Sequence, residues 1–346
     1  MKIAISVGSA YYDGSNWEDL VELVKFADRI GVDYAWSAEA WGMDAVTPLA
    51  YLAALTDNIK LGTGIMQTSA RTPAAAAMTS LSLARLSNNR FVLGLGVSGP
   101  QVVEGLHGAP FDRPLGRLRE YIAIVRQGIS GERIAIDGEH YVLPRPGGEG
   151  KALRLGMHPN PSIPIYLATL GPKMLELTGE VADGWVGTSF IPESSADVIG
   201  HLRSGAEKAG RQLGDLDLQV NATIEISDDV DALIAKYKRS SAFTLGAMGS
   251  AETNFYNNAY SRAGWSDMAA KVQSLWVAGD KAAAIEAVEP EFVLQTQMVG
   301  TESMVLERIR ATAAVGITTL RVAPMGKTSQ EQQSNLEQVV DLIGRI

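Results

Sequence analysis

Apolar runs of strand length alternate with longer amphipathic stretches along the whole chain, and this alternation restricts the fold more than any other feature. Trp17–Ile30 has helical spacing, Gly31 ends it, and Val32–Trp36 reads as a buried strand. The same join of helix, glycine and strand returns at Ala314–Arg321. Strands are expected over residues 1–7, 32–36, 59–65, 91–97, 163–167, 185–190, 216–226 and 317–322.

The repeated unit predicts an α/β fold of the TIM (β/α)8 barrel type. Strands that alternate with helices form parallel sheets, and about eight such units in one chain close into a barrel. We expect a single domain over residues 1–346, with inserted segments at about 101–160 and 229–300 that exceed an ordinary connection. The first contains a hairpin pattern around Asp137-Gly138, and the second has a mostly helical pattern.

Composition narrows the classes of partner. The chain has no cysteine, a net charge of −9, and four histidines without metal-ligand spacing. These features argue against a disulfide framework, a metal site and a nucleic-acid partner, whose binding draws on basic patches. No apolar run reaches the roughly 20 residues that a membrane span needs, and the N-terminus has the pattern of a first strand rather than a signal peptide. We therefore expect a cytoplasmic protein that acts on a small molecule.

The loop after the strand at 163–167 has the composition of an anion site. It consists of Ala168, Thr169, Leu170, Gly171, Pro172 and Lys173. Proline suits the first turn of a helix, because its missing N–H is not needed there. A helix N-terminus attracts phosphate through its free N–H groups, the small residues allow close approach, and Lys173 adds positive charge. The loop is a predicted phosphate site.

The same stretch carries a resemblance to a known family. The motif AxxGPK at 168–173, followed by GExADG at 179–184, resembles the phosphate-binding segment of the bacterial luciferase-like oxidoreductases. Within them it is most similar to the branch that uses the deazaflavin coenzyme F420, which includes enzymes of the methylenetetrahydromethanopterin reductase and F420-dependent glucose-6-phosphate dehydrogenase types. The resemblance covers nearly the whole chain, and it implies a TIM barrel with inserted segments and a homodimer.

Leu61–Met66 resembles the bulge after the third strand of this family, where relatives hold a non-prolyl cis peptide bond against the deazaflavin ring. The matching positions make Gly64–Ile65 the candidate cis bond. The resemblance thus implies that Gly64, Ile65 and Met66 back the ring. The alternative is an ordinary strand end that contains glycine.

The sequence GLGVSG at 94–99 matches the G-x-G-x-x-G of dinucleotide-binding folds. A Rossmann site is disfavoured, because other strands precede it, Pro100 follows at once, and no strand-ending acid occurs about 20 residues later. In the barrel interpretation Gly96, Val97 and Ser98 supply backbone close to the cofactor. The chain lacks the acid or asparagine that several relatives carry after this glycine pair. The resemblance therefore does not extend to their sugar-phosphate substrate or its catalytic glutamate.

Glu39 is the ionisable side chain at the end of the second strand, flanked by Trp36 and Trp41. A carboxyl group against aromatic surface holds its proton more readily, as a general acid or base requires, and relatives often place an acid or histidine here near the reacting carbon. In the structural alternative Glu39 only hydrogen-bonds a neighbouring loop. Trp41 either lines a planar ring or packs in the core, and Arg71 is expected to be solvated.

Together these features predict an F420-dependent oxidoreductase that transfers a hydride between the deazaflavin and a small organic substrate. In this hypothesis the 168–173 loop binds the cofactor phosphate, the strand ends at 64–66 and 96–98 back the ring together with Trp41, and Glu39 handles the proton. An FMN-dependent luciferase-like monooxygenase is the alternative, because both use the same barrel. A cofactor-binding protein without turnover is a third class, in which Glu39→Ala would change no assay.

Overall fold

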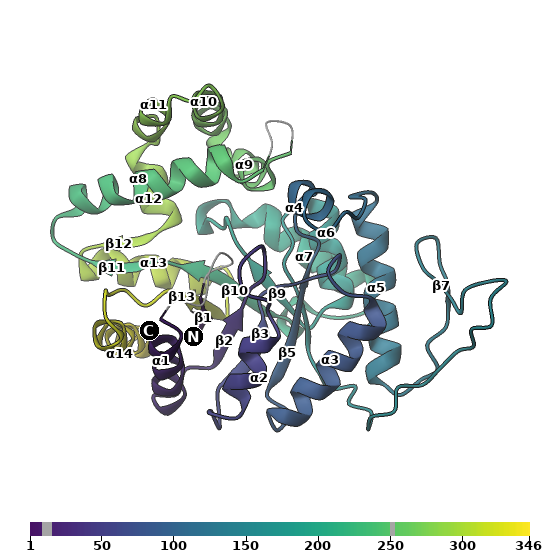
Figure 1. Ribbon diagram of the computed structural model, residues 1–346. Helices are drawn as coiled ribbons and strands as arrows, with labels where there is room; N and C mark the ends of the chain where they lie inside the picture. Colours follow the sequence, from purple (N-terminus) through teal and green to yellow (C-terminus); the bar gives the residue numbers. More distant parts are fainter. Residues whose placement is uncertain (9–15, 250–252) are drawn as a thin grey trace.

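The computed structural model describes residues 1–8, 16–249 and 253–346. Within these residues a closed barrel of eight parallel strands forms the centre of the molecule (Figure 1). In order around the barrel the strands are β1 (Lys2–Val7), β2 (Tyr34–Ser37), β3 (Lys60–Thr63), β5 (Phe91–Gly96), β8 (Ile165–Leu167), β9 (Gly184–Gly187), β10 (Asp217–Ala222) and β13 (Thr319–Val322). The short strand β4 (Met66–Gln67) also pairs with β5. The predicted TIM barrel is confirmed.

Helices cover the outside of the barrel (Figure 1). They are α1 (Trp17–Arg29), α2 (Thr47–Ala53), α3 (Pro73–Leu86), α5 (Pro114–Ile129), α6 (Pro172–Val181), α7 (Ser195–Lys208), α13 (Glu302–Ala314) and α14 (Ser329–Gly344), with 3-10 turns η1 (Pro192–Ser194) and η2 (Leu213–Asp215). The hydroxyl of Thr72 caps α3, and Thr328 with Glu331 forms a capping box on α14. Within the described ranges, no helix combines the length and apolar character needed to cross a membrane.

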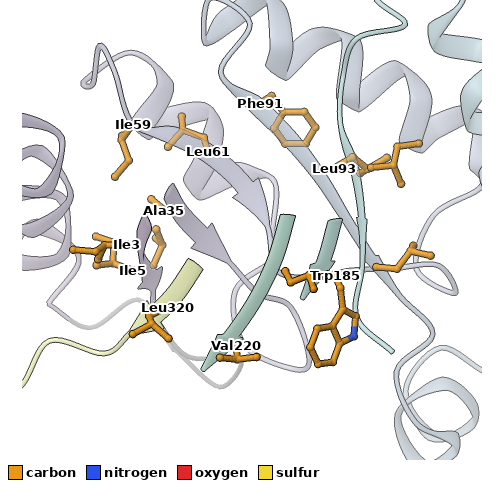
Figure 2. Packing of buried hydrophobic residues seen from close by; sticks show 14 of the residues in the cluster. Ile3, Ile5, Ala35, Ile59, Leu61, Phe91, Leu93, Trp185, Val220 and Leu320 are labelled. Atoms are coloured by element: carbon orange, nitrogen blue, oxygen red, sulfur yellow. The ribbon is translucent and has the colours of Figure 1, made fainter. Parts of the chain in front are cut away.

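Apolar side chains fill the layer between the strands and these helices (Figure 2). Alternate residues of each strand point outward, so that one face of every strand packs against helices. Ile5, Leu93 and Leu320 are examples, each 0% exposed. Burying each such side chain contributes about 1.5–3 kcal/mol of transfer free energy. The inward-facing positions are thereby left for the barrel interior and its chemistry.

The long excursion leaves the barrel and returns to it through two paired strands. β11 (Ile224–Ile226) and β12 (Met298–Gly300) form a separate parallel pair. The strand expected over 216–226 is therefore two strands, because β12 rather than a barrel strand is the partner of β11. Between them the segment forms α8 (Val230–Ala247), α9 (Phe255–Tyr260), the π-helical turn η3 (Ser261–Trp265), α10 (Ser266–Val277), α11 (Lys281–Glu286) and α12 (Pro290–Thr296). These helices pack around their own apolar cluster, at the top of Figure 1.

The other long segment contains the expected hairpin. It starts with α4 (Pro100–Gly105), and after α5 the strands β6 (Ile136–Asp137) and β7 (Val142–Leu143) pair in antiparallel fashion. Glu120 of α5 holds the turn between them. Its carboxylate accepts hydrogen bonds of 2.8–2.9 Å from the N–H groups of Glu139, His140 and Tyr141. The strand expected over 185–190 is shorter than predicted, since β9 ends at Gly187.

Candidate active site

The carboxyl ends of the strands form the mouth of the barrel, where the active sites of TIM barrels lie. The neighbouring strands β2, β3, β5 and β8 form one half of this mouth, and β9, β10, β13 and β1 form the other. The first, which we call the glycine half, presents Gly62, Gly64, Gly94 and Gly96. The second, which we call the polar half, presents Ser6, Thr188, Asn221 and Arg321.

Trp36 is the floor of the glycine half. Trp36 is only 2% exposed, and its ring stacks on that of Tyr34 with the ring centroids 5.7 Å apart. A Cβ atom on Gly62 would lie 2.3 Å from the Trp36 ring, and one on Gly94 would lie 1.9 Å from the Thr63 carbonyl oxygen. Glycine is therefore required at both positions. The Trp36 ring therefore fills the barrel interior beneath the mouth and covers buried glycine backbone on β3 and β5.

The Gly64–Ile65 peptide bond is cis, as the resemblance predicted. The N–H of Gly64 donates to the carbonyl of Ser37 at 2.7 Å, and the carbonyl of Ile65 accepts from the N–H of Glu39 at 3.3 Å. On the other side, a Cβ atom on Gly96 would lie 2.8 Å from Cδ1 of Ile65. The bulge is thus held between β2 and the end of β5.

Glu39 lies two residues after the end of β2, and its carboxylate accepts hydrogen bonds from several donors. Oε1 accepts from Arg71 at 2.6 Å and from the N–H of Gln67 at 2.9 Å, and Oε2 accepts from the N–H of Ala45 at 3.0 Å. These bonds satisfy a side chain that is 8% exposed. The expectation of a solvated Arg71 was wrong, because the turn after β4 brings it back over the end of β2. The contacts of Glu39 favour the structural alternative, and its predicted part in proton transfer stays a prediction.

Two of the predicted ring contacts differ in exposure. Met66 is 0% exposed and belongs to the core between barrel and helices, so neither its side chain nor its backbone is accessible at the mouth. Trp41 is 60% exposed, so it lies outside the core. Of the two interpretations of Trp41, packing in the core is excluded.

The end of β5 borders a cavity. Ser98 has a φ of 59°, in the left-handed region, and Val97 is half-buried. Val97 and Arg71 line a cavity of about 340 Å³, together with residues of the 68–73 turn and the 109–112 segment. The glycine half therefore opens on this side into a space large enough for part of a ligand.

The loop 168–173 follows β8, the strand next to β5. Thr169 is 4% exposed, and its hydroxyl pairs with that of Thr178 at 2.7 Å. α6 starts at Pro172 after Gly171, which provides no side-chain cap. The N–H groups of the first helical turn have no partner within an α-helix, so they stay available to an anion, and Lys173 beside them is exposed. The local geometry fits a phosphate group.

Arg262, which the sequence analysis did not single out, reaches this loop from the excursion. It lies in η3 and donates to the carbonyl of Leu170 at 2.7 Å, with Asp197 of α7 at 3.8 Å. Leu170 and Arg262 also line a small pocket of about 20 Å³. The excursion therefore adds a positive charge next to the predicted phosphate site, and only the fold could reveal this approach.

The polar half contains a second arginine that the sequence analysis did not assign. Alternation along β13 turns Arg321 into the barrel, since the residues on either side of it pack outward in the core. It is level with Ala4 of β1 and Asn221 of β10, and its guanidinium crosses to β9, where it donates to the carbonyl of Gly187 at 2.7 Å. The available signal was a lone charge within the apolar run of the last strand.

Arg321 has few partners for a group in the barrel interior. Its Nε atom is buried without a hydrogen-bond partner among the described residues. Burial lowers the pKa of Arg321 to about 10, so that it carries its charge at neutral pH. Around it Ser6 and Asn221 are exposed and Thr188 is half-buried, with Asn221 donating to the Thr188 hydroxyl at 3.4 Å. The polar half is thus open to solvent.

At the opposite end of the barrel, the buried carboxylate of Asp217 on β10 has many hydrogen-bond donors around it. Its carboxylate accepts hydrogen bonds of 2.9–3.0 Å from Tyr34, Tyr166, Gln219 and Thr319, accepts another from Thr318, and lies 3.6 Å from the Lys2 ammonium. Burial by itself would raise the pKa of Asp217, but these hydrogen bonds and the Lys2 charge lower it below the ordinary value. Burial and then the Asp217 charge raise the pKa of both tyrosines.

The predicted site residues therefore lie on consecutive strands of one half of the mouth, from β2 to β8. Among the described residues no group of three or more His, Asp or Glu side chains is placed to hold a metal ion. The family described as luciferase-like monooxygenase matches residues 1–319. The chain belongs to the luciferase-like family.

Relatives of this luciferase-like chain have names that refer to F420 or to reduction. A protein of Mycobacterium tuberculosis, whose name proposes a coenzyme F420-dependent oxidoreductase, is 39% identical over 338 residues, covering 95% of this chain and 96% of its own. A 5,10-methylenetetrahydromethanopterin reductase of Methanolobus tindarius is 29% identical over 329 residues, 94% of each chain. The structure of a coenzyme F420-dependent tetrahydromethanopterin reductase of Methanopyrus kandleri superposes with a TM-score of 0.76, at 22% identity over 97% of both chains. The luciferase-like chain is an enzyme.

Proposed function

We propose that this luciferase-like enzyme is a coenzyme F420-dependent oxidoreductase acting on a small organic substrate. The observation that carries the proposal is the uncapped N-terminus of α6 behind the 168–173 loop, in a chain 39% identical to a relative named for F420. When bound, coenzyme F420 supplies a ring carbon that carries a hydride. The residues of the chain bind this cofactor, orient it and hold the substrate against it.

The two parts of the glycine half fit two parts of such a cofactor. The free amides of α6, with Lys173 and Arg262 nearby, suit an anionic phosphate. The half-buried backbone at 64–65 and 97–98, above the buried Trp36 ring, suits a planar ring. In the proposal Trp41, exposed at the same edge, closes over that ring.

We assign Glu39 a positioning role in this proposal. It accepts hydrogen bonds from Gln67 and Arg71, and so holds the turn that follows the bulge. Glu39→Gln and Arg71→Met should then weaken F420 binding by a similar factor, since each breaks the same ion pair. If Glu39 handles the proton instead, Glu39→Gln abolishes turnover while F420 binding stays intact, and Arg71→Met does not reproduce that result.

Parallel titration of the apoprotein with F420 and with FMN, followed by cofactor fluorescence, tests the proposal. We expect tight binding of F420 and weak binding of FMN. Preference for FMN would redirect the assignment to the monooxygenase alternative, and binding of neither would reject the phosphate role of the loop.

A matched pair of glycine variants sharpens the test. Gly171→Asp places a carboxylate at the N-cap of α6, where a Cβ atom meets nothing within 4 Å. It should stabilise the helix yet weaken F420 binding about tenfold or more, because the new charge occupies the anion site. Gly200→Asp on α7, also with open space around the Cβ position, is the control and should leave binding unchanged. Equal affinities for both variants would contradict the phosphate site.

We further propose that the enzyme acts in the cytoplasm as a homodimer, on the strength of the family resemblance. Light scattering of the purified protein measures the subunit number directly, and a monomeric mass would reject the dimer.

A further inference from the structure

The polar half of the mouth faces the glycine half and has no function in the proposal so far. Its interior positions on four adjacent strands carry Ser6, Arg321, Asn221 and Thr188, all of them hydrogen-bonding side chains. The glycine half offers a ring surface with almost no side-chain donors. A substrate held between a ring and the opposite wall would therefore meet these polar groups.

Arg321 is the charged residue among these four, and its described partners do not neutralise its charge. The only described acceptor of its guanidinium is the Gly187 carbonyl, at 2.7 Å. Burial lowers its pKa, and no carboxylate of the described residues contributes to the shift. Glu39, the acid predicted at the mouth, has its carboxylate occupied by Arg71 and two backbone N–H groups. A buried cation costs stability when no anion lies beside it, and the described residues offer Arg321 none, which points to a ligand that supplies the anion.

The shape of the Arg321 guanidinium limits the kinds of anion that it would bind well. A guanidinium is planar and offers donors in a fork that matches the two oxygens of a carboxylate. The contact to Gly187 uses one terminal nitrogen and leaves other N–H groups of the fork free of described acceptors. Asn221 and Thr188, exposed and half-buried at the same level, add neutral donors on one side.

We propose that Arg321, with Asn221 and Thr188, forms a binding site for a planar oxyanion in the polar half of the mouth. The oxyanion is either the carboxylate of a substrate or an ionised oxygen at the edge of the cofactor ring. This inference deepens the proposed function and rests on it for the placement of the ring in the glycine half. Where the substrate supplies the oxyanion, Arg321 is a determinant of substrate charge.

Matched carboxylates and amides test the site without knowledge of the substrate. The probes are propionate and benzoate against propionamide and benzamide, at constant ionic strength, with wild type, Arg321→Met and the exposed-helix control Arg203→Met. Dissociation constants come from calorimetry, on the apoprotein and on the F420-loaded protein. Wild type and Arg203→Met should bind the carboxylates about tenfold or more tightly than the amides, and Arg321→Met should lose this preference.

Titration of F420 alone distinguishes the two sources of the oxyanion. If the substrate supplies it, Arg321→Met binds F420 as wild type does while the carboxylate preference is lost. If the cofactor ring supplies it, Arg321→Met binds F420 about tenfold more weakly, whereas wild type shows no preference in the loaded protein, because its site is already filled. Failure of wild type to bind F420 rejects only the proposed function. The carboxylate and amide measurements on the apoprotein do not depend on F420 binding, so they still test the Arg321 site.

Two outcomes overturn the inference. One is an equal ratio of carboxylate to amide binding in wild type and Arg321→Met, with unchanged affinity for F420. The other is a lowered unfolding midpoint in both Arg321→Met and Arg321→Lys with no ligand effect of either, which would make Arg321 a structural link between β13 and β9. Arg321→Lys, which keeps the charge but not the fork, should retain part of the preference.

Discussion

Asp217 and Arg321 both point into the barrel, one near each end of its interior, and the protein surrounds them in opposite ways. Asp217 accepts hydrogen bonds from five side chains and lies near an ammonium group, whereas Arg321 donates to one carbonyl and keeps a buried Nε atom without a described partner. A buried charge with all its hydrogen-bond partners in place stabilises the fold. A buried charge without them lowers stability, and in the proposal Arg321 is kept because it binds a ligand. The bottom of this barrel is built for stability and the mouth for a ligand.

The largest effect is expected from Asp217→Asn. The change leaves hydroxyl donors without their anion, and breaking a buried charged network costs about 3–5 kcal/mol. Urea unfolding of the variant against wild type measures this loss. Asp341→Asn, on the exposed face of α14, is the control and should stay within about 0.5 kcal/mol. A loss of similar size in both would remove Asp217 from the comparison.

A second test uses acid. Hydrogen bonds and Lys2 lower the pKa of Asp217 in the folded state, so its contribution is fully present above the unfolded value of about 4 and is lost as pH falls through the lowered folded value. The gap in unfolding free energy between wild type and Asp217→Asn should therefore shrink below about pH 4. A gap that stays constant from pH 5 to pH 3 would show that folding does not lower the pKa of Asp217.

The tyrosines that contact Asp217 should have smaller effects. Tyr34→Phe and Tyr166→Phe each remove one hydroxyl that donates to the carboxylate, at 2.9 and 3.0 Å. A hydrogen bond to a charged group contributes about 1.5–3 kcal/mol, and the remaining donors limit the loss to the lower part of this range. In the Asp217→Asn background the same changes should cost less, and a double-mutant cycle measures the difference. Strict additivity would contradict the network.

The smallest effect on stability is expected at Arg321. Arg321→Met removes an unsatisfied cation and loses one hydrogen bond to a carbonyl, two changes of opposite sign. The unfolding free energy should change by about 0.5 kcal/mol or less, or rise, in contrast to the loss at Asp217. Thermal and urea unfolding at pH 7 measure it. A loss of about 3 kcal/mol would show that Arg321 stabilises the fold as Asp217 does, and the two ends of the barrel would then be alike.

Much of the fold was predictable, because it depends on periodicity that the sequence displays directly. The join at Gly31 and its counterpart at Gly316 mark helix ends, each glycine having a positive φ that other residues rarely adopt. The cis bond at Gly64–Ile65 was predicted only through resemblance, since nothing in the local composition distinguishes it from a plain strand end. The limits of β10 were wrong, because the partner of β11 is distant in the sequence.

The site was less predictable, because pairing across the barrel has no signature along the chain. Arg71 was expected in solvent, and its pairing with Glu39 depends on how the turn after β4 folds back. Arg262 approaches Leu170 from 92 positions away, through a helical excursion whose course cannot be read from its pattern. Asp217 and Arg321 look equivalent as single charges in apolar strands. Only their contacts in the folded protein show that Asp217 has its hydrogen-bond partners in place and that Arg321 can still bind an anion.

The pairing of β11 with β12 has a consequence for how this enzyme can change. The two strands bring the start and the return of the excursion side by side, with Ile224 level with Met298. A segment whose ends are already adjacent can be lengthened, shortened or exchanged at low entropic cost, while the barrel keeps the same attachment points. Recombination at these two strands would replace the helices beside the 168–173 loop in one step and leave both interior charges in place. Substrate range and scaffold can thus diversify separately.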